Sequence, residues 1–335
     1  GCAYRCGHYK NIGCIRIITE DGEKLTFLVG TRGSNLSLAQ TNWVISELQK
    51  ENVGSEFEIK TITTKGDTDT RALFTIDQKG IFEKEIDKAV AEKQIDFAVH
   101  SLKDVPSDIP KSLTIACIPK REPPNDVFIT KDGSNLQTIQ SGAVVGTSSL
   151  RRAVQISRIR SDVVVKPVRG NIETRINKVI EGKFDAIILA QAGISRLALD
   201  VKHSVLSTKD FPPSPGQGAL AIVCRVDDDK TISMLKKIED KKSRTEIEAE
   251  RALSEYVESG CRFPVGALAI ADSSMLKLTV AAYSVDGKKS VILEKTGDTD
   301  KPKNLGQELG EELKKSGIAE IASNWRESLE EWNKK

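Results

Sequence analysis

The chain has 335 residues, 39% of them hydrophobic and 29% charged, a length that predicts two or three domains with real cores. Lys and Arg number 50 against 48 Asp and Glu, and this balance gives no electrostatic reason to expect a nucleic acid or an anionic membrane as partner. No apolar run approaches the roughly 20 residues of a membrane span. Six cysteines in so long a chain favour a reducing, cytoplasmic setting over a disulfide framework.

The N-terminal residues 1–22 carry Cys2, Cys6, His8 and Cys14. Their spacing fits no standard zinc pattern, and the segment lacks the apolar core of a secretory signal. We therefore interpret residues 1–22 as an extension outside the folded domains and expect no metal site. If the extension is the remnant of a targeting segment, an organellar stroma replaces the cytoplasm as the expected location.

Two segments of the chain repeat one pattern, in which a strand is followed by Gly-Thr, a hydroxyl-rich turn and a helix. The first is the strand at 25–30 with the turn Thr31-Arg-Gly-Ser34, and the second is the strand at 143–146 with Thr147-Ser-Ser-Leu-Arg-Arg152. Ser34 and Ser148 are the expected N-caps. Helix N-termini favour anions, so two such turns that carry arginine predict paired α/β halves facing one anionic ligand.

Further strand–helix units complete both halves, and their alternation predicts largely parallel sheets. The linkers at 119–125 and 211–218 are rich in Pro and Gly, and they place the second half as an insertion in the first. Such an arrangement can hinge. The last third of the chain combines a helix near 243–257, strands near 267–271, 276–284 and 290–295, and acidic helices from about 304, and it predicts a small α+β domain.

The expected fold class is thus α/β, with two hinged α/β domains like those of periplasmic binding proteins and a small C-terminal α+β domain. The expected boundaries follow the linkers. They are 1–22 for the extension, 23–119 with 219–237 for the first domain, 124–213 for the inserted second domain and 241–335 for the third.

The stretch His100-Ser-Leu-Lys-Asp-Val-Pro106 follows a buried apolar strand at 95–99. Lys103 and Asp104 therefore lie where that strand ends, and ligands of open α/β sheets bind beyond the carboxyl ends of strands. A solvated Lys–Asp pair on a turn is the alternative. The remainder of the chain favours the functional interpretation.

Arginines recur just after predicted strands or in the first helical turn beyond them. Arginine stays charged and binds carboxylates through two parallel hydrogen bonds. Any one of these arginines could lie on a solvated helix face, but the set indicates a ligand with several carboxylates or phosphates. No nucleotide-binding glycine motif is present. The arginines are Arg32, Arg151, Arg152, Arg169, Arg175 and Arg196.

Cys261 lies beside Arg262 in a turn bounded by Gly and Pro, where a thiol can become a nucleophile. A lone cysteine is more often inert, and Cys117 and Cys224, within apolar strands, fit that description. The few histidines offer no Cys-His-Asp set, so a cysteine protease is a poor interpretation.

A series of motifs over about residues 25–330 resembles the hydroxymethylbilane synthase family, also called porphobilinogen deaminase. Two departures are visible: Asn125 replaces the usual basic residue of Arg121-Glu-Pro-Pro-Asn-Asp126, and Arg262-Phe263 follow Cys261. The motifs, in order, are Thr31-Arg-Gly-Ser34, His100 to Pro106, Thr147 to Arg152, Val168-Arg-Gly-Asn171 with Arg175, Leu189-Ala-Gln-Ala-Gly193, Pro215-Gly-Gln-Gly218 and Gly260-Cys261.

The resemblance implies a transferase of haem and porphyrin biosynthesis that condenses four porphobilinogen molecules on a dipyrromethane cofactor, joined to Cys261 through a thioether. It implies that Asp104 is catalytic and that residues 64–70 form a lid. It implies porphobilinogen as the small-molecule partner, and we expect a monomer. The implied cofactor ligands are Lys103, Asp104, Ser148, Arg151, Arg152 and Arg175, and the implied substrate ligands are Arg32, Ser34, Arg169 and Arg196.

A receptor module without chemistry, in which two hinged α/β halves bind an anion, is the competing hypothesis. Such a receptor needs neither a third domain with Cys261 nor Asp104 beside the anion sites. If secreted, it would also need an export signal, which the sequence does not contain.

Overall fold

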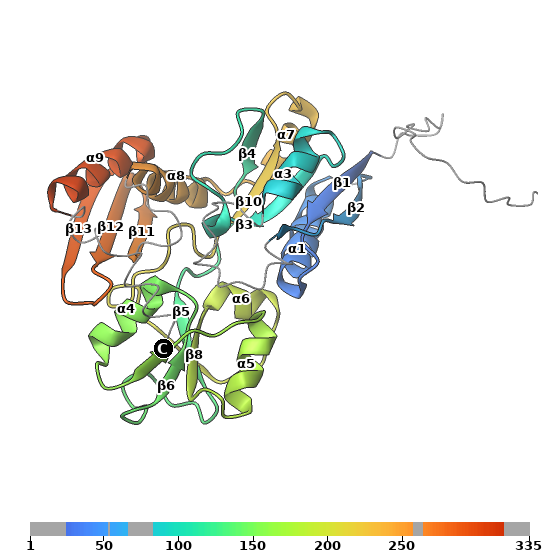
Figure 1. The fold of residues 1–335 in the computed structure, drawn as a ribbon. Coiled ribbons are helices and arrows are strands. Elements are labelled where there is room, and N and C mark those ends of the chain that lie inside the picture. The colour runs from blue at the N-terminus through green and yellow to red at the C-terminus, as the bar shows by residue number, and fades with distance from the viewer. Residues whose placement is uncertain (1–24, 53, 66–82, 257–263, 318–335) are drawn as a thin grey trace, which may run out of the picture.

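The computed structural model describes residues 25–52, 54–65, 83–256 and 264–317. These residues form three sheets, and Figure 1 shows them as two α/β lobes with a smaller third unit beside both. No helix among these residues is both long and apolar enough to cross a membrane.

The first lobe is built on a five-stranded sheet of order β2-β1-β3-β10-β4. Its strands are β1 (Thr26–Thr31), β2 (Glu56–Thr61), β3 (Phe97–Ser101), β4 (Leu113–Cys117) and β10 (Leu220–Arg225). Its helices are α1 (Asn35–Glu51), α3 (Lys84–Ala91) and α7 (Asp229–Leu235), with the 3-10 turns η1 (Leu102–Asp104) and η2 (Lys236–Ile238).

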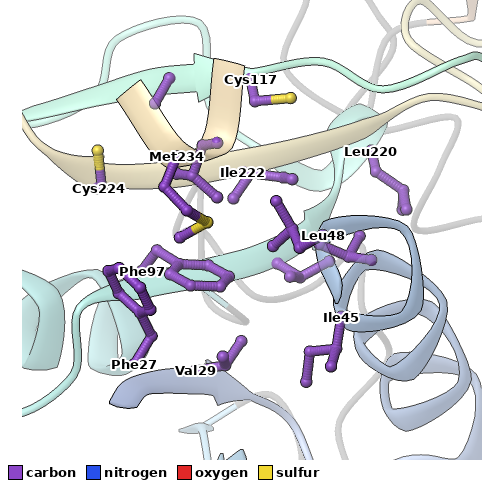
Figure 2. Packing of buried hydrophobic residues seen from close by; sticks show 14 residues of the cluster. Phe27, Val29, Ile45, Leu48, Phe97, Cys117, Leu220, Ile222, Cys224 and Met234 are labelled. Atoms are coloured by element: carbon purple, nitrogen blue, oxygen red, sulfur yellow. The ribbon is translucent and has the colours of Figure 1, made fainter. Parts of the chain in front are cut away.

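Apolar side chains fill both faces of this sheet because its central strands are buried on both sides. Along β3, Phe97 and Val99 belong to one core cluster, while Ala98 between them belongs to the cluster on the other face. Figure 2 shows the first cluster, in which Leu48 of α1 and Met234 of α7 pack against the sheet. This packing fixes the end of β3, from which Lys103 and Asp104 follow.

The second lobe repeats the plan with a sheet of order β7-β6-β8-β5-β9. Its strands are β5 (Asp126–Thr130), β6 (Val144–Gly146), β7 (Val164–Lys166), β8 (Ala186–Ala190) and β9 (His203–Val205). Its helices are α4 (Leu150–Ile159), α5 (Ile172–Ile180) and α6 (Gln191–Arg196).

The sheets are largely parallel, as predicted, because four of the five strands in each run in one direction and a single strand runs against them. In the first lobe β1 pairs in parallel with β2 and β3, but β10 runs antiparallel to β3 and β4. In the second lobe β5 runs antiparallel to β8 and β9. Both exceptions are the strands that enter a lobe from a linker. They arrive without a crossover helix, so nothing forces them to be parallel.

The third unit is an antiparallel sheet covered by two helices. Its sheet has the order β11-β12-β13, and apolar residues of both helices pack on one face of it. This is the expected α+β arrangement. Its elements are α8 (Lys241–Tyr256), β11 (Val265–Asp272), β12 (Met275–Tyr283), β13 (Ser290–Asp298) and α9 (Pro302–Lys315).

The two linkers run beside one another where the chain passes between the lobes. The amide of Glu122 donates to the carbonyl of Gly218 over 3.2 Å. Gly218 has φ of +89°, and a Cβ there would lie 2.3 Å from the Glu122 carbonyl oxygen. Only glycine tolerates both conditions, which accounts for the second Gly of the Pro-Gly-Gln-Gly turn.

Glu250 of α8 joins both linkers to the third unit. Its carboxylate is fully buried and accepts hydrogen bonds from Arg121 Nη1 at 2.7 Å and Nη2 at 3.1 Å. It also accepts from the amides of Gly216, at 2.6 Å, and Ala269, at 2.9 Å. One carboxylate thus binds the first linker, the second linker and β11.

We predict that Glu250→Ala lowers the free energy of unfolding by about 3–5 kcal/mol, because the buried Arg121 guanidinium loses its nearest counter-charge and keeps only Glu246 at 3.8 Å. Denaturant unfolding followed by far-UV circular dichroism measures the change. Glu255→Ala, an exposed position on the same helix, is the matched control and should change stability by no more than about 0.5 kcal/mol. Equal stability of the two variants would refute the role of Glu250.

Candidate functional site

The site starts at the end of β3, where Lys103 and Asp104 form the turn η1. The amide of Leu102 donates to the carbonyl of Ala219 on the second linker at 3.0 Å, and the amide of Val105 donates to Leu102 at 3.1 Å. The prediction that Lys103 and Asp104 follow a buried strand is confirmed. Both side chains are half-buried, and within the described part of the chain neither makes a side-chain hydrogen bond.

A buried cluster of charge faces this turn from the second lobe. Asp126, the first residue of β5, has no exposed surface. Its Oδ2 accepts from Arg151 Nη2 at 2.7 Å, and its Oδ1 accepts from Arg152 Nη2 at 2.7 Å and Nε at 3.0 Å. The side-chain amide of Gln217 adds a fourth hydrogen bond, 2.9 Å from Oδ1. The arginine pair therefore has a carboxylate of the protein as its partner.

The pKa of Asp126 reflects two opposed effects. Burial alone raises the pKa of a carboxyl group, but the attraction of Arg151 and Arg152 and their hydrogen bonds outweigh it, and the pKa falls to about 2. Burial lowers the pKa of Arg151, although Asp126 opposes the change. Asp126 is thus a permanent anion at the centre of the site.

The remaining basic groups have too little negative charge around them. Burial lowers the pKa of Lys103, and Asp104 raises it while Arg152 lowers it further. Burial lowers the pKa of Arg175 to about 10, and its charged neighbours, Arg152 and Arg169, are cations that act in the same direction. A half-buried site with excess positive charge is stabilised when an anion binds, so the site fits a polyanionic ligand.

The hydroxyl groups of the two glycine–threonine turns behave differently from one another. Ser34 is the N-cap of α1 and accepts from the Ser37 amide at 3.2 Å, as predicted. The prediction for Ser148 was wrong, because Ser149 caps α4. Ser148 instead donates its hydroxyl hydrogen to the carbonyl of Val168, which ties the α4 turn to the loop that carries Arg169.

The helix that follows the first repeated turn, α1, contacts α5 of the second lobe, whereas the second repeated turn, at 147–152, leads into α4. Asn35 at the start of α1 donates from Nδ2 to Glu173 Oε1 in the first turn of α5, over 2.7 Å. Arg32 lies just before α1, and Arg169 lies just before α5. These residues therefore stand on opposite sides of one junction between the lobes.

Arg196 ends α6 and reaches the second linker. Its Nη2 donates to the carbonyl of Gly218 at 2.7 Å. Burial lowers the pKa of Arg196 to about 10, and Glu122 is the acidic neighbour that opposes this change. Arg175 is likewise held by one contact, from Nε to the carbonyl of Gly170 at 2.8 Å, and in the described structure its two Nη groups make no hydrogen bond.

Sequence reasoning missed Asp126 and Gln217. Gln217 accepts from Arg152 Nη2 at 3.3 Å while it donates to Asp126 and to the carbonyl of Pro124 at 2.6 Å. Its place in Pro215-Gly-Gln-Gly218 suggested only a hinge turn. A signal was present for Asp126, since an acidic residue that opens an apolar strand and is fully buried needs a cationic partner.

Several sequence expectations concern cysteine and metal chemistry. Cys117 and Cys224 are buried free thiols, as predicted, and burial raises the pKa of both, that of Cys224 to about 12. Cys261, the segment 66–70 of the expected lid and the N-terminal cysteines lie outside the described residues. Within those residues, no group of three or more His, Cys, Asp or Glu side chains could hold a metal ion.

His100 belongs to the motif of Lys103 and Asp104 but not to the site. It is buried in the first lobe, with Nε2 lying 3.1 Å from Oδ1 of Asp87 on α3. The motif thus combines a packing residue with two site residues.

The chain matches sequence models of a known family over most of its length. The model described as porphobilinogen deaminase, dipyromethane cofactor binding domain, matches residues 27–233, and the model of the C-terminal domain of porphobilinogen deaminase matches residues 244–315. A probable porphobilinogen deaminase of Nitrosopumilus maritimus is 66% identical over 92% of this chain and 100% of its own length. A porphobilinogen deaminase of Oceanobacillus iheyensis is 44% identical over 91% of this chain and 99% of its own.

Solved structures resemble the chain only loosely. An amino-acid transporter extracellular-binding protein of Bacillus subtilis, YtmK, superposes with a TM-score of 0.38 at 12% identity, over 64% of this chain and 90% of its own. The periplasmic VFT2 domain of Bordetella pertussis BvgS gives 0.36 at 15% identity, over 64% and 86%. At these scores the two-lobed fold rests on the strand order and the paired linkers described above.

We predict that Asp126→Asn costs about 3–5 kcal/mol of unfolding free energy at pH 7, because two buried arginines lose their anion. The carboxyl has a folded pKa of about 2 and an unfolded value near 3.9, so its contribution is complete above pH 4 and is lost as the pH falls towards 2. The difference between wild type and variant should therefore shrink by about 2 kcal/mol over that interval.

Urea unfolding between pH 2 and pH 7 measures this difference. The exposed Asp210→Asn is the control and should track wild type at every pH. A difference for Asp126→Asn that does not change with pH would contradict the charge assignment.

Proposed function

The chain belongs to the porphobilinogen deaminase family, and from that premise we propose how its residues carry out the family's reaction. The activity is hydroxymethylbilane synthesis, a transferase reaction of haem and porphyrin biosynthesis. Four porphobilinogen molecules condense in turn, each step loses ammonia, and water releases 1-hydroxymethylbilane. What remains to be assigned is the role of each side chain at the junction of the lobes.

The observation that carries the assignment is the excess positive charge beside an unpartnered carboxylate. Lys103 and Arg175 lie near the Asp126 cluster with donor groups unused, and Asp104 lies next to Lys103. Porphobilinogen bears an acetate and a propionate, so each unit added to the product brings two carboxylates. Basic side chains on both lobes match that charge.

The residues present also fit the dipyrromethane cofactor for which the family's domain model is named. Arg151 Nε is buried without a hydrogen-bond partner in the described structure, and Lys103 has no carboxylate bonded to it. Two pyrroles with acetate and propionate groups would supply such acceptors. When bound through Cys261, the cofactor supplies the primer to which the first substrate is joined.

Within this proposal, the side chains divide by the acceptors they already have, and each set draws on both lobes. Most donors of Arg151 and Arg152 are bonded to acceptors of the protein, among them Asp126, so these two arginines contribute charge and a fixed frame more than free donors. Lys103 and Arg175 hold the cofactor carboxylates with them, and Ser148 joins them when its hydroxyl turns away from the carbonyl of Val168. The substrate and the growing chain are held by Arg32, Ser34, Arg169 and Arg196.

Asp104 is the proposed catalytic group. Loss of ammonia from porphobilinogen leaves positive charge on the methylene-pyrrole unit, and a carboxylate fixed beside that unit stabilises the charge as it forms. The same carboxylate can accept hydrogen bonds from pyrrole N–H groups and move protons. No protein donor competes for it within the described structure, because its carboxylate makes no hydrogen bond there.

The remaining expectations concern how and where the protein works. We propose that it acts as a monomer in the cytoplasm on a free small molecule, without nucleic acid or membrane. The receptor hypothesis is disfavoured, because relatives that match over 91% and 92% of this chain are named as porphobilinogen deaminases.

We predict that Asp104→Asn slows turnover about 10²-fold or more, on the scale of losing one electrostatic stabiliser, while the fold stays intact. Asp104→Glu should be milder because the charge remains but is displaced. Single-turnover consumption of porphobilinogen measures the rate, with cofactor loading checked by intact mass. Wild-type rates in Asp104→Asn would leave Asp104 as a structural partner of Lys103 and assign the chemistry elsewhere.

We predict that the purified protein is heavier than its sequence by one dipyrromethane on Cys261, and that Cys261→Ser lacks this mass and is inactive. Intact mass and peptide mapping test both statements. Cys117→Ala and Cys224→Ala are matched controls. They should keep the added mass and lose about 1 kcal/mol of stability through packing. Active protein with unmodified Cys261 would disprove the attachment.

A further inference from the structure

The backbone that follows Asp104 is held by a side chain from the third unit. Arg251 of α8 donates from Nη2 to the carbonyl oxygens of Pro106, at 2.9 Å, and Ser107, at 3.0 Å. Its Nη1 lies 3.4 Å from the carbonyl oxygen of Val105. One planar guanidinium thus spans three consecutive carbonyls directly after Asp104.

Asp104 depends on this backbone because its own side chain is bound to nothing. Its carboxylate makes no hydrogen bond in the described structure. On the N-terminal side, the turn is held by the bond from the Leu102 amide to Ala219. On the C-terminal side, the turn is held by the guanidinium of Arg251. The Leu102–Ala219 bond and the Arg251 contacts together fix the position of the Asp104 carboxylate.

Arg244, the other arginine on α8, shows what a purely structural role looks like. It forms an ion pair with Glu239 and donates to the carbonyl of Ile115 on β4 at 3.2 Å. Arg251 makes no ion pair within 4.0 Å among the described residues, and it spends its donors on the Asp104 loop. Glu255 is the acidic neighbour of Arg251, but all the hydrogen bonds of Arg251 go to the loop after Asp104, unlike those of Arg244.

We propose that Arg251 is a positioning residue for Asp104, which couples the third unit to the catalytic turn. The inference rests on the role of Asp104 given above. Helix α8 ends at Tyr256, shortly before Cys261 in the sequence, so the helix that grips the Asp104 loop also leads to the proposed cofactor attachment point. Lysine cannot replace the fork, since a single ammonium cannot span three carbonyls.

The test compares Arg251→Met, Arg251→Lys and the control Arg244→Met in the cofactor-loaded enzyme. We expect Arg251→Met to lower kcat about 10-fold with little change in KM, because a displaced Asp104 stabilises the transition state less well. Arg251→Lys should recover only part of the loss. Amide hydrogen exchange in peptides that span residues 102–108 should accelerate in Arg251→Met and stay at the wild-type rate in Arg244→Met.

A double-mutant cycle with Asp104→Asn separates positioning from general stability. If Arg251 acts through Asp104, then Arg251→Met should slow turnover no further in the Asp104→Asn background, whereas an independent effect would multiply. Should Arg251→Met fail to fold, Arg251→Lys enters the same cycle.

Three results would overturn the inference: an unchanged kcat in the folded Arg251 variants, multiplicative effects in the cycle, or unchanged exchange over residues 102–108. Failure of the Asp104 assignment is distinct, because Asp104→Asn alone would then turn over at the wild-type rate. If kcat fell in Arg251→Met but stayed at the wild-type value in Asp104→Asn, the positioning role would be refuted and Arg251 would act through another residue.

Discussion

The buried carboxylate of Glu250 is the contact on which the relation between the three parts of the chain depends. It accepts four hydrogen bonds, from the Arg121 guanidinium and from the amides of Gly216 and Ala269. Arg121 in turn donates from Nε to the carbonyl of Gln217 at 2.9 Å. Because Gln217 also bonds to Asp126, one continuous network joins the third unit, both linkers and the floor of the site. A displacement of α8 is therefore transmitted to the arginine pair through groups that are buried and partnered at each step.

Much of the fold followed from the sequence where burial determined the pattern. The apolar runs that became β3, β8 and β10 were found because both faces of these strands are buried. The strand β5 was not predicted, although all its residues are buried, and the direction of β10 could not be found, since an apolar run does not record which way its strand enters a sheet. The N-cap of α4 was misplaced by one residue because Ser148 and Ser149 are chemically equivalent in sequence, and only the carbonyl of Val168 distinguishes them.

The site was harder to predict than the fold, because the balance of charge in the site depends on which residues far apart in the sequence lie close together in space. The arginines could be found from their places after strands, but Asp126 is far from Arg151 in the sequence and meets it at 2.7 Å. Sequence reasoning therefore gave Arg151 and Arg152 wholly to the ligand, whereas in the structure both are hydrogen-bonded to Asp126. Gln217 was assigned to turn chemistry for the same reason, because its partners are set by the approach of the two linkers.

Three acidic residues near the junction have two kinds of environment, and the difference distinguishes structural carboxylates from the proposed catalytic one. Glu250 and Asp126 are buried, and each accepts four hydrogen bonds, so neither has an acceptor left for a ligand. Asp104 is half-buried and accepts none among the described residues. A half-buried carboxylate that accepts no hydrogen bond is unfavourable for the free protein. A ligand with a cationic or N–H-bearing group removes this cost when it binds. A pyrrole unit of the substrate that becomes positively charged as it loses ammonia is such a group. The acetate and propionate of that unit can pair with the surrounding arginines. The same arrangement would serve a passive anion receptor poorly, because Asp104 would repel the anion that the arginines attract.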